Sequence, residues 1–489
     1  MFGKVVLTGV ALVVFGLTKL VFNTLVIRRF PATFLGEINQ ALSFFMLIPL
    51  FYAPVLGMVV SKFASEFLGA NEPDKSRRVF SLSFVLVAAT SAVSTVVALV
   101  FSGRISALLQ IQPAILLCLT PMLALYSGYI FLRTSYYGFD RIALYLRNEI
   151  VSSLAFFGVL IAALLMHSQR LAVWPFAAQG AVFLGLAIYH LRDQFCFRAM
   201  YRGIAGDLRR CAHFFFYTIF NSMSGPGAFH LGIILTGRLT GSSEIAAYYS
   251  VLLYSLQPFN LLPISLASVM IPTISRHHGA GEIREGVAVA ERAFPPLLLG
   301  MTLLWGCGTL LGWEAVQVIS GASTGELIVA FEVVLFGLYL NMIFAPPSVL
   351  LNSTRHIAVI AWGGAAALVA TLGVWWWGIP AYGLLGSAAG YGLLQAGKGA
   401  WAFLAARRIL QWRGQFDRAA LATISAIVAL GVVSLASRSL WLHIALAALL
   451  VGIFFRLHGQ AVGEYVKRLI AETRAHAPGA VRLSDSESG

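Results

Sequence analysis

One charged residue lies deep inside the first long apolar run of the sequence. Lys19 is roughly eight residues, or about 12 Å of helical rise, from either end of that run. If the run crosses a bilayer, an ammonium group at this depth costs about 2.5–3.5 kcal/mol on insertion scales. We therefore expect Lys19 to face a wet cavity and to bind an anion there, with Asn23 on the same helical face. The alternative, that the side chain reaches the membrane surface, is disfavoured by the distance.

Further basic and titratable residues occupy comparable positions. His230 lies in a later apolar run, just after the polar, proline-containing segment 221–227. Histidine titrates near neutral pH, so His230 is a candidate for coupling proton movement to transport; a packed, hydrogen-bonded histidine is the alternative. Arg28, Arg29 and Arg238 stand at the outer ends of two runs, where they form a basic rim or simply contact lipid headgroups.

Uncharged polar side chains complete this set. Asn39 lies in the second apolar run, and Tyr254 and Gln257 belong to a polar stripe on the eighth. Amides and phenols suit hydroxyl-rich ligands, and they equally suit hydrogen bonds between helices. Acidic residues are scarce, because Glu149 and Glu332 fall close to the ends of their runs. We therefore expect a cationic cavity that suits a phosphate-bearing substrate.

No motif for covalent catalysis or metal binding accompanies these residues. The sequence lacks Cys-x2-Cys, His-x3-His and carboxylate–histidine clusters with metal-ligand spacing. Its short loops leave no room for a soluble catalytic domain. We therefore expect no enzyme, no metal site and no cofactor, with coupling to H+ or Na+ left open.

The composition places these residues in a membrane. Of 489 residues, 59% are hydrophobic and 11% are charged, and the mean hydropathy is +0.82. A soluble domain has about 25% charged residues, so most of this surface must face lipid. Since a span needs about 20 apolar residues, the sequence predicts an all-α, polytopic membrane protein with about 14 transmembrane helices. The predicted spans are 5–27, 38–61, 80–102, 112–136, 146–167, 172–191, 210–236, 245–274, 288–311, 327–352, 357–378, 381–405, 419–436 and 440–457.

The distribution of basic residues predicts the orientation. The sequence has 34 Lys and Arg against 20 Asp and Glu, with a formal net charge of +14. Most of the basic residues flank the predicted spans on the side that carries both termini. By the positive-inside rule, this side is the cytoplasmic face of the cell (inner) membrane. The positive charge therefore reflects topology, and we expect no nucleic-acid partner.

An internal repeat relates the two halves of the chain. The second and eighth spans each contain a Pro-x4-Pro motif, and the two motifs are displaced by the same interval as Arg29 and Arg238. Proline removes a helical hydrogen bond and kinks its helix, so the two motifs are predicted hinges beside a central cavity. The hinge residues are Pro49, Pro54, Pro258 and Pro263.

This repeat predicts how the chain is divided. Two pseudo-symmetric six-helix lobes are related by an axis along the membrane normal, and two C-terminal helices are added to them. The predicted segments are an N-terminal lobe at 1–192, a cytoplasmic linker at 193–209, a C-terminal lobe at 210–408, an additional helix pair at 409–458 and a cytoplasmic tail at 459–489. Residues 461–473 are predicted to form an amphipathic helix on the inner leaflet.

Short motifs in both lobes carry a family resemblance. In the first lobe they are residues 23–29 and Gly36-Glu-Ile-Asn39. In the second lobe they are Gly237-Arg238, Ala247-Tyr-Tyr-Ser250 and residues 270–275 with Gly279. With these motifs and its span pattern over 5–405, the chain resembles the multidrug/oligosaccharidyl-lipid/polysaccharide (MOP) exporter superfamily. It is most similar to the polysaccharide transporter branch, which includes O-antigen-type lipid-linked oligosaccharide flippases, although Ala247 replaces a glycine usual there.

The resemblance implies a transport function. Members have two lobes in a V that alternates between inward-open and outward-open states, and this branch flips a polyprenyl-diphosphate-linked oligosaccharide to the outer leaflet. In relatives, basic cavity residues engage the diphosphate. Lys19, Arg29 and Arg238 stand at matching positions, whereas the second helix has no basic residue before Lys62.

The resemblance also bounds the alternatives and the partners. Lipid II flippases, which also have fourteen spans, and MATE-like drug or metabolite antiporters are the other functions considered. The expected partners are the lipid-linked glycan and membrane lipids, and other polysaccharide assembly proteins are left open. We expect a monomer.

Overall fold

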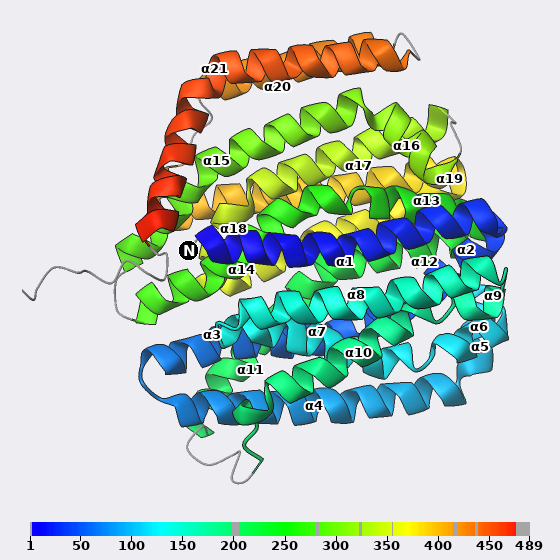
Figure 1. Ribbon diagram of the computed structural model, residues 1–489, viewed down its shortest axis with the longest axis horizontal. Coiled ribbons are helices and arrows are strands. Elements are labelled where there is room, and N and C mark those ends of the chain that lie inside the picture. Colours follow the sequence, from blue (N-terminus) through cyan, green and yellow to red (C-terminus); the bar gives the residue numbers. More distant parts are fainter. Residues whose placement is uncertain are drawn as a thin grey trace, which may run out of the picture.

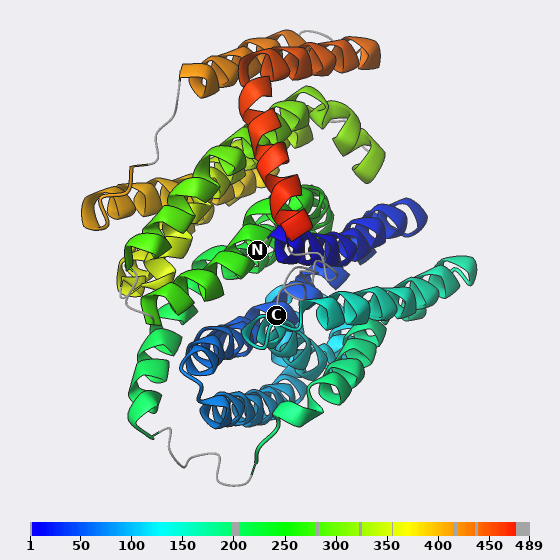
Figure 2. The same ribbon diagram turned by 60° about the vertical axis from the view of Figure 1, so that its left-hand side comes forward.

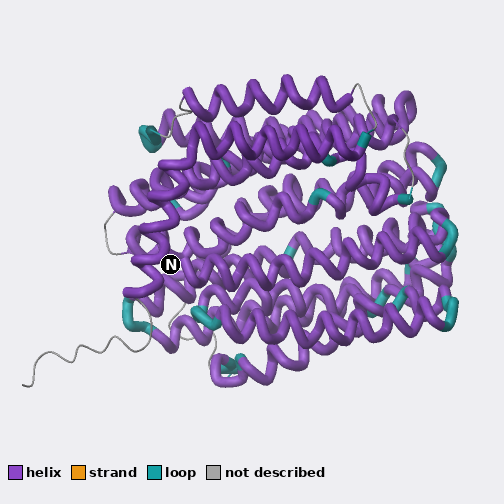
Figure 3. The backbone as a smooth tube through the Cα atoms, turned by 45° about the horizontal axis from the view of Figure 1, so that its top comes forward, coloured by secondary structure: helices purple, strands orange, loops and turns teal. Residues whose placement is uncertain are grey.

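The protein consists of long helices joined by short loops. The computed structural model describes residues 2–197, 205–279, 283–321, 325–354, 356–413, 418–435 and 439–475. Within these ranges there is no strand, as Figure 3 shows, so the all-α prediction is confirmed. In the described part of the chain, nine helices are long and apolar enough to cross a bilayer. Exposed apolar side chains such as Val100, Leu165 and Trp376 cover their outer faces, as expected for a multi-pass membrane protein.

The first half of the chain forms one bundle, shown from blue to teal in Figures 1 and 2. Its core contains tightly packed aromatic rings, with Phe176 centred 4.9 Å from Phe22 and 5.0 Å from Phe156. Its elements are α1 (Phe2–Arg29), α2 (Ala32–Leu47), η1 (Ile48–Phe51), α3 (Ala53–Gly69), α4 (Pro73–Val100), α5 (Ser102–Leu109), α6 (Pro113–Leu119), α7 (Met122–Gly138), α8 (Ile142–Leu165), α9 (Gln169–Ala172), α10 (Pro175–His190) and η2 (Arg192–Gln194).

The second half forms a similar bundle, shown from green to orange. Its core is separate from the first and includes Trp305 stacked on Tyr339, with ring centres 4.6 Å apart. Its elements are α11 (Ala205–Ser222), the π-helical η3 (Met223–Gly227), α12 (Ala228–Thr240), α13 (Ser243–Ser255), α14 (Gln257–Gly279), α15 (Ile283–Leu310), α16 (Gly312–Ser320), α17 (Gly325–Ile343), α18 (Ala345–Ser353) and α19 (Ile357–Ile409).

Two further helices pack on the outside of the second bundle. α20 (Arg418–Leu435) and α21 (Leu440–Ala475) pair with each other and lie against α15 (Figure 1). The last part of α21, which contains the predicted amphipathic segment 461–473, turns toward the end of the molecule where the N-terminus lies. The lobe boundaries stay a prediction, and parts of the predicted linker (198–204) and tail (476–489) lie outside the described residues.

Helix α19 shows how two predicted spans are joined. Its 53 residues cover the predicted spans 357–378 and 381–405, which form an antiparallel hairpin that reverses at Gly383. Gly383 has φ +51° and ψ −117°, a backbone conformation that glycine adopts without steric cost. Across the hairpin, Trp375 Nε1 donates a hydrogen bond to the Ser387 carbonyl at 3.0 Å.

The helices that carry the Pro-x4-Pro motifs are interrupted in both lobes. In the first lobe, α2 ends at Leu47, Pro49 lies in the 3-10 turn η1, and Pro54 is the second residue of α3. In the second lobe, α13 ends at Ser255 and α14 begins at Gln257, directly before the second motif. The side chains of Pro258 and Pro263 lie outside the described residues. The predicted breaks are thus present, whereas hinge motion at these prolines stays a prediction.

Candidate functional site

The two lobes meet along a polar seam in the middle of the bundle. Asn39 on α2 donates hydrogen bonds to Asn23 Oδ1 on α1 at 2.7 Å and to Ser250 Oγ on α13 at 2.6 Å. This amide therefore connects the first lobe to the second. His230 on α12 lies 3.4 Å from Ser43 Oγ on α2, measured from Nδ1. The structure brings together three of the predicted site residues, Asn23, Asn39 and His230, and buries all of them.

Lys19 lies next to this seam, one helical turn before Asn23. Its side chain is only 8% exposed, and its Nζ is 3.9 Å from Met46 Sδ. The same Nζ is 4.7 Å from the centre of the Phe15 ring and 5.6 Å from that of Tyr254, which belongs to the second lobe. Among the described residues, Lys19 has no carboxylate within ion-pair distance. An ammonium has three donors, and rings and a thioether satisfy them poorly, so the group is free to bind an anion.

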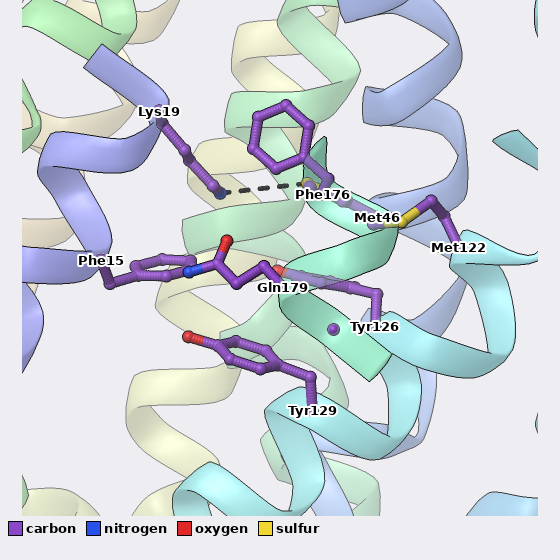
Figure 4. Close-up of a pocket in the computed structure, with 9 residues that line it drawn as sticks. Phe15, Lys19, Met46, Met122, Tyr126, Tyr129, Phe176 and Gln179 are labelled. Atoms are coloured by element: carbon purple, nitrogen blue, oxygen red, sulfur yellow. Dashed lines mark hydrogen bonds between the residues drawn. The ribbon is translucent and has the colours of Figure 1, made fainter. Parts of the chain in front are cut away.

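A small cavity extends from Lys19 into the first lobe, as Figure 4 shows. Its volume is about 20 Å³, room for about one water molecule. Four of its polar or aromatic side chains come from three helices: Phe15 from α1, Tyr126 and Tyr129 from α7, and Gln179 from α10. In Figure 4 these side chains and Lys19 converge on one point inside the lobe.

Glu149 is an acidic residue whose position the sequence did not reveal. Because Glu149 is near the predicted start of the fifth span, the sequence predicts that its carboxylate lies at the membrane surface and that no acidic side chain is near the cavity. The structure instead buries it fully in α8. Tyr129 donates to both of its carboxylate oxygens at 3.0 Å, and Gln179 Nε2 donates to one of them at 3.3 Å. A carboxylate therefore lies behind the cavity, and the expectation of a cavity without a nearby acid is corrected.

Arg133 on α7 is a second charged group that the sequence did not assign to the site. Its guanidinium carbon is 4.6 Å from the centre of the same Phe15 ring and 5.9 Å from that of Tyr145. The sequence contains one indication that Arg133 and Glu149 lie near each other. Arg133 and Glu149 stand at similar distances on either side of the tight turn at Asp140, so an antiparallel hairpin places them at the same level.

The arginines of the predicted rim lie elsewhere. Arg28 and Arg29 are exposed at the end of α1, roughly 15 Å of helix rise beyond Lys19. Arg28 donates to the carbonyl of Val318 on α16, and Arg29 contacts the ring of His167. Arg238 is exposed on α12. The predicted grouping of Lys19 with these arginines is therefore not found, because the side chains at the end of α1 turn outward.

Two remaining predicted residues are on the second lobe. Tyr254 is buried and packs edge-on against Phe229, with ring centres 5.1 Å apart, while its own ring faces Lys19. Gln257 is half-buried at the first residue of α14. Within the described ranges, no three His, Cys, Asp or Glu side chains gather in a metal-binding group.

The lobes are in contact at both ends of the seam. At the end far from the N-terminus, a Cβ on Gly36 of α2 would overlap the backbone of Ser243, the first residue of α13. At the other end, α3 packs on α11 and α14, and Arg210 donates to Glu66 at 2.6 Å. The structure is therefore a closed state, in which the lobes touch at both ends of the seam.

Comparisons with known proteins give the fold. No protein-family model matches the sequence, and no curated protein matches it. The chain is similar to the lipid II flippase MurJ in an inward closed conformation, with a TM-score of 0.67 and 12% identity over 94% of this chain and 100% of that chain. It is also similar to the Vibrio cholerae MATE transporter VcmN in the bent form, with a TM-score of 0.63 and 16% identity over 84% and 96%.

A third solved structure is a MOP superfamily transporter from Pyrococcus furiosus, with a TM-score of 0.62 and 14% identity over 87% of this chain and 95% of that chain. The chain thus has the fold of MOP superfamily transporters and flippases. At these identities the likeness concerns the fold alone.

Proposed function

We propose that this protein is a flippase that moves a polyprenyl-diphosphate-linked oligosaccharide from the inner to the outer leaflet of the cell (inner) membrane. The supporting observation is Lys19, a buried cation between the two lobes without a carboxylate partner. An ammonium in this position favours a phosphate-bearing headgroup over an organic cation. Glu149, the nearby acid, is already bound by Tyr129 and Gln179.

Alternating access is the proposed mechanism. The buried hydrogen bond from Asn39 to Ser250 and the contact of His230 with Ser43 join the lobes at the seam, and we propose that they break when α2 separates from α12 and α13. The helix breaks at Leu47–Ala53 and Ser255–Gln257 are the proposed hinges. The termini are proposed to be cytoplasmic, so the headgroup passes Lys19 and then leaves past the exposed Arg28, Arg29 and Arg238. Release into the outer leaflet completes the cycle.

A lipid II flippase is the second candidate. The match to MurJ covers 94% of this chain, whereas three matches to MATE transporters cover 81–88%. The substrate of either flippase is a lipid-linked diphosphate, so Lys19 is suited to bind the headgroup in both cases. The extent of the match disfavours a drug antiporter.

Replacement of Lys19 tests the proposal. Lys19→Ala is expected to abolish glycan export while the protein stays in the membrane, because the headgroup loses its buried cation. Lys19→Arg, which keeps the charge, should retain export in part. Full export by Lys19→Ala would contradict the assignment, and ethidium efflux that depends on this chain would favour the antiporter.

His230 is the proposed link to a proton gradient. It is buried in the seam, so a proton on its ring would place a charge between the lobes. The measurement is glycan export against external pH. An unchanged profile in His230→Gln would remove proton coupling through this residue and leave the flippase assignment intact.

A further inference from the structure

We infer that the headgroup site contains two cations, Lys19 and Arg133, arranged for a diphosphate, and that Glu149 is its internal counter-ion. This inference rests on the proposed flippase function and defines its binding site more closely. It moves the site from the space between the lobes into the first lobe, on α1, α7 and α8.

Lys19 and Arg133 both lie close to the ring of Phe15. Lys19 Nζ is 4.7 Å and Arg133 Cζ is 4.6 Å from the centre of that ring. The charges therefore cannot be further apart than these two distances added together. Like charges held this close repel each other, so the arrangement gains most from an anion that contacts both. A diphosphate carries oxygens on two phosphorus atoms and can accept from both groups at once.

Neither cation is neutralised by direct contact. In the described part of the chain, no carboxylate oxygen forms an ion pair with Lys19 or Arg133, and their close neighbours are aromatic rings. Arg133 is half-buried as a residue, whereas Lys19 is only 8% exposed. An anion that contacts both groups would lie between α1, which carries Lys19, and α7, which carries Arg133.

Glu149 balances these charges from behind. Its oxygens accept hydrogen bonds from Tyr129 and Gln179, which also line the cavity beside Lys19. Electrostatic interaction links Glu149 to both Arg133 and Lys19, although neither touches it. The site therefore combines two basic side chains with one acidic side chain. Glu149 reduces the free-energy cost of burying the two cations. It also repels the diphosphate that binds to them.

Binding of a short isoprenyl diphosphate to the purified full-length chain tests this arrangement. The probes are geranyl diphosphate and geranyl monophosphate, and affinity is measured by calorimetry in lipid nanodiscs. Arg133→Gln should weaken diphosphate binding by about tenfold or more and monophosphate binding much less, because one of two contacts is lost. Glu149→Gln, whose amide still fits between Tyr129 and Gln179, should bind the diphosphate about tenfold more tightly.

Lys398 provides the matched control. It is a second lysine within a span, half-buried on α19 of the second lobe, where its Nζ donates to the Ser224 carbonyl at 3.1 Å. Lys398→Met should leave both affinities unchanged. Arg133→Lys keeps the charge in a smaller group and should retain most of the diphosphate affinity, which separates loss of charge from misfolding.

The outcomes distinguish this inference from the proposed function. If Lys19→Met loses diphosphate binding while Arg133→Gln and Glu149→Gln match the wild-type protein, the two-cation site is refuted and the flippase assignment stands. If the wild-type protein binds neither probe, both are refuted. Equal affinity of the wild-type protein for diphosphate and monophosphate would also overturn the two-cation arrangement.

Discussion

The hydrogen bonds of Asn39 should set the balance between the closed and open states. Asn39→Ala removes the bonds to Asn23 and Ser250, and the second of these crosses between the lobes. Hydrogen bonds between helices in membranes contribute about 0.6 kcal/mol on average and up to about 1.7. Only the bond to Ser250 differs between the closed and open states, so its loss should destabilise the closed state by about 0.6–1.7 kcal/mol relative to open states, a shift of about 3- to 18-fold in their ratio.

The assay is a distance measurement between the lobes. Spin labels on cysteines at Gln112 and Tyr382, both exposed and in different lobes, report lobe separation by pulsed electron resonance. Asn148→Ala is the matched control, because Asn148 is equally buried and donates a 2.7 Å hydrogen bond to Tyr136 within the first lobe alone. We expect a larger population at long distance in Asn39→Ala and an unchanged distribution in Asn148→Ala.

Two results would refute this reasoning. An unchanged distance distribution in Asn39→Ala would mean that the seam does not hold the lobes together. An equal shift in both variants would mean that general loss of stability, and not the contact between the lobes, opens the molecule.

Three further variants test other contacts. Gly36→Leu should prevent closure of the lobes, because any side chain at this position meets the backbone of Ser243. The spin-labelled variant should then lack the short-distance population. A distance distribution like that of the wild-type protein would contradict the close packing of α2 on α13. Arg210→Glu should favour separation at the N-terminal end, measured between labels at the exposed residues Asn71 and Arg407. Since Arg210 is 55% exposed, the expected effect is at most about 1 kcal/mol. The double variant with Glu66→Arg should restore the wild-type distance distribution, and failure to restore it would argue against the ion pair. Arg29→Ala should change the affinity for geranyl diphosphate by no more than about twofold, because Arg29 is exposed and distant from Lys19. A tenfold loss of affinity would show that Arg29 belongs to the binding site.

Much of the fold was accessible from the sequence because the apolar runs have the length of a bilayer span. The gap between the eleventh and twelfth predicted spans, at residues 379–380, lies three residues before the turn at Gly383, and the first Pro-x4-Pro motif coincides with the break at η1. Prolines and glycines determine such points through local backbone geometry, which requires no knowledge of the neighbouring helices.

The candidate site was only partly accessible. Lys19 stood out because a charge in mid-span has few explanations. Arg133 and Glu149 were missed, since their role depends on which faces of α7 and α8 turn toward α1, and packing decides this. Arg28 and Arg29 were assigned to a rim near the site, yet their contacts with Val318 and His167 point them away from Lys19.

The most direct measurement is flipping of a fluorescent polyprenyl-diphosphate oligosaccharide by the purified chain in liposomes, detected by the accessibility of the sugar to an external glycosidase. The wild-type protein should transfer the lipid, and Lys19→Met should slow transfer by about tenfold to a hundredfold, the loss expected for one hydrogen bond to a charged group. Transfer by Lys19→Met at the wild-type rate, or no transfer by the wild-type protein, would contradict a buried cation that guides an anionic headgroup across the membrane.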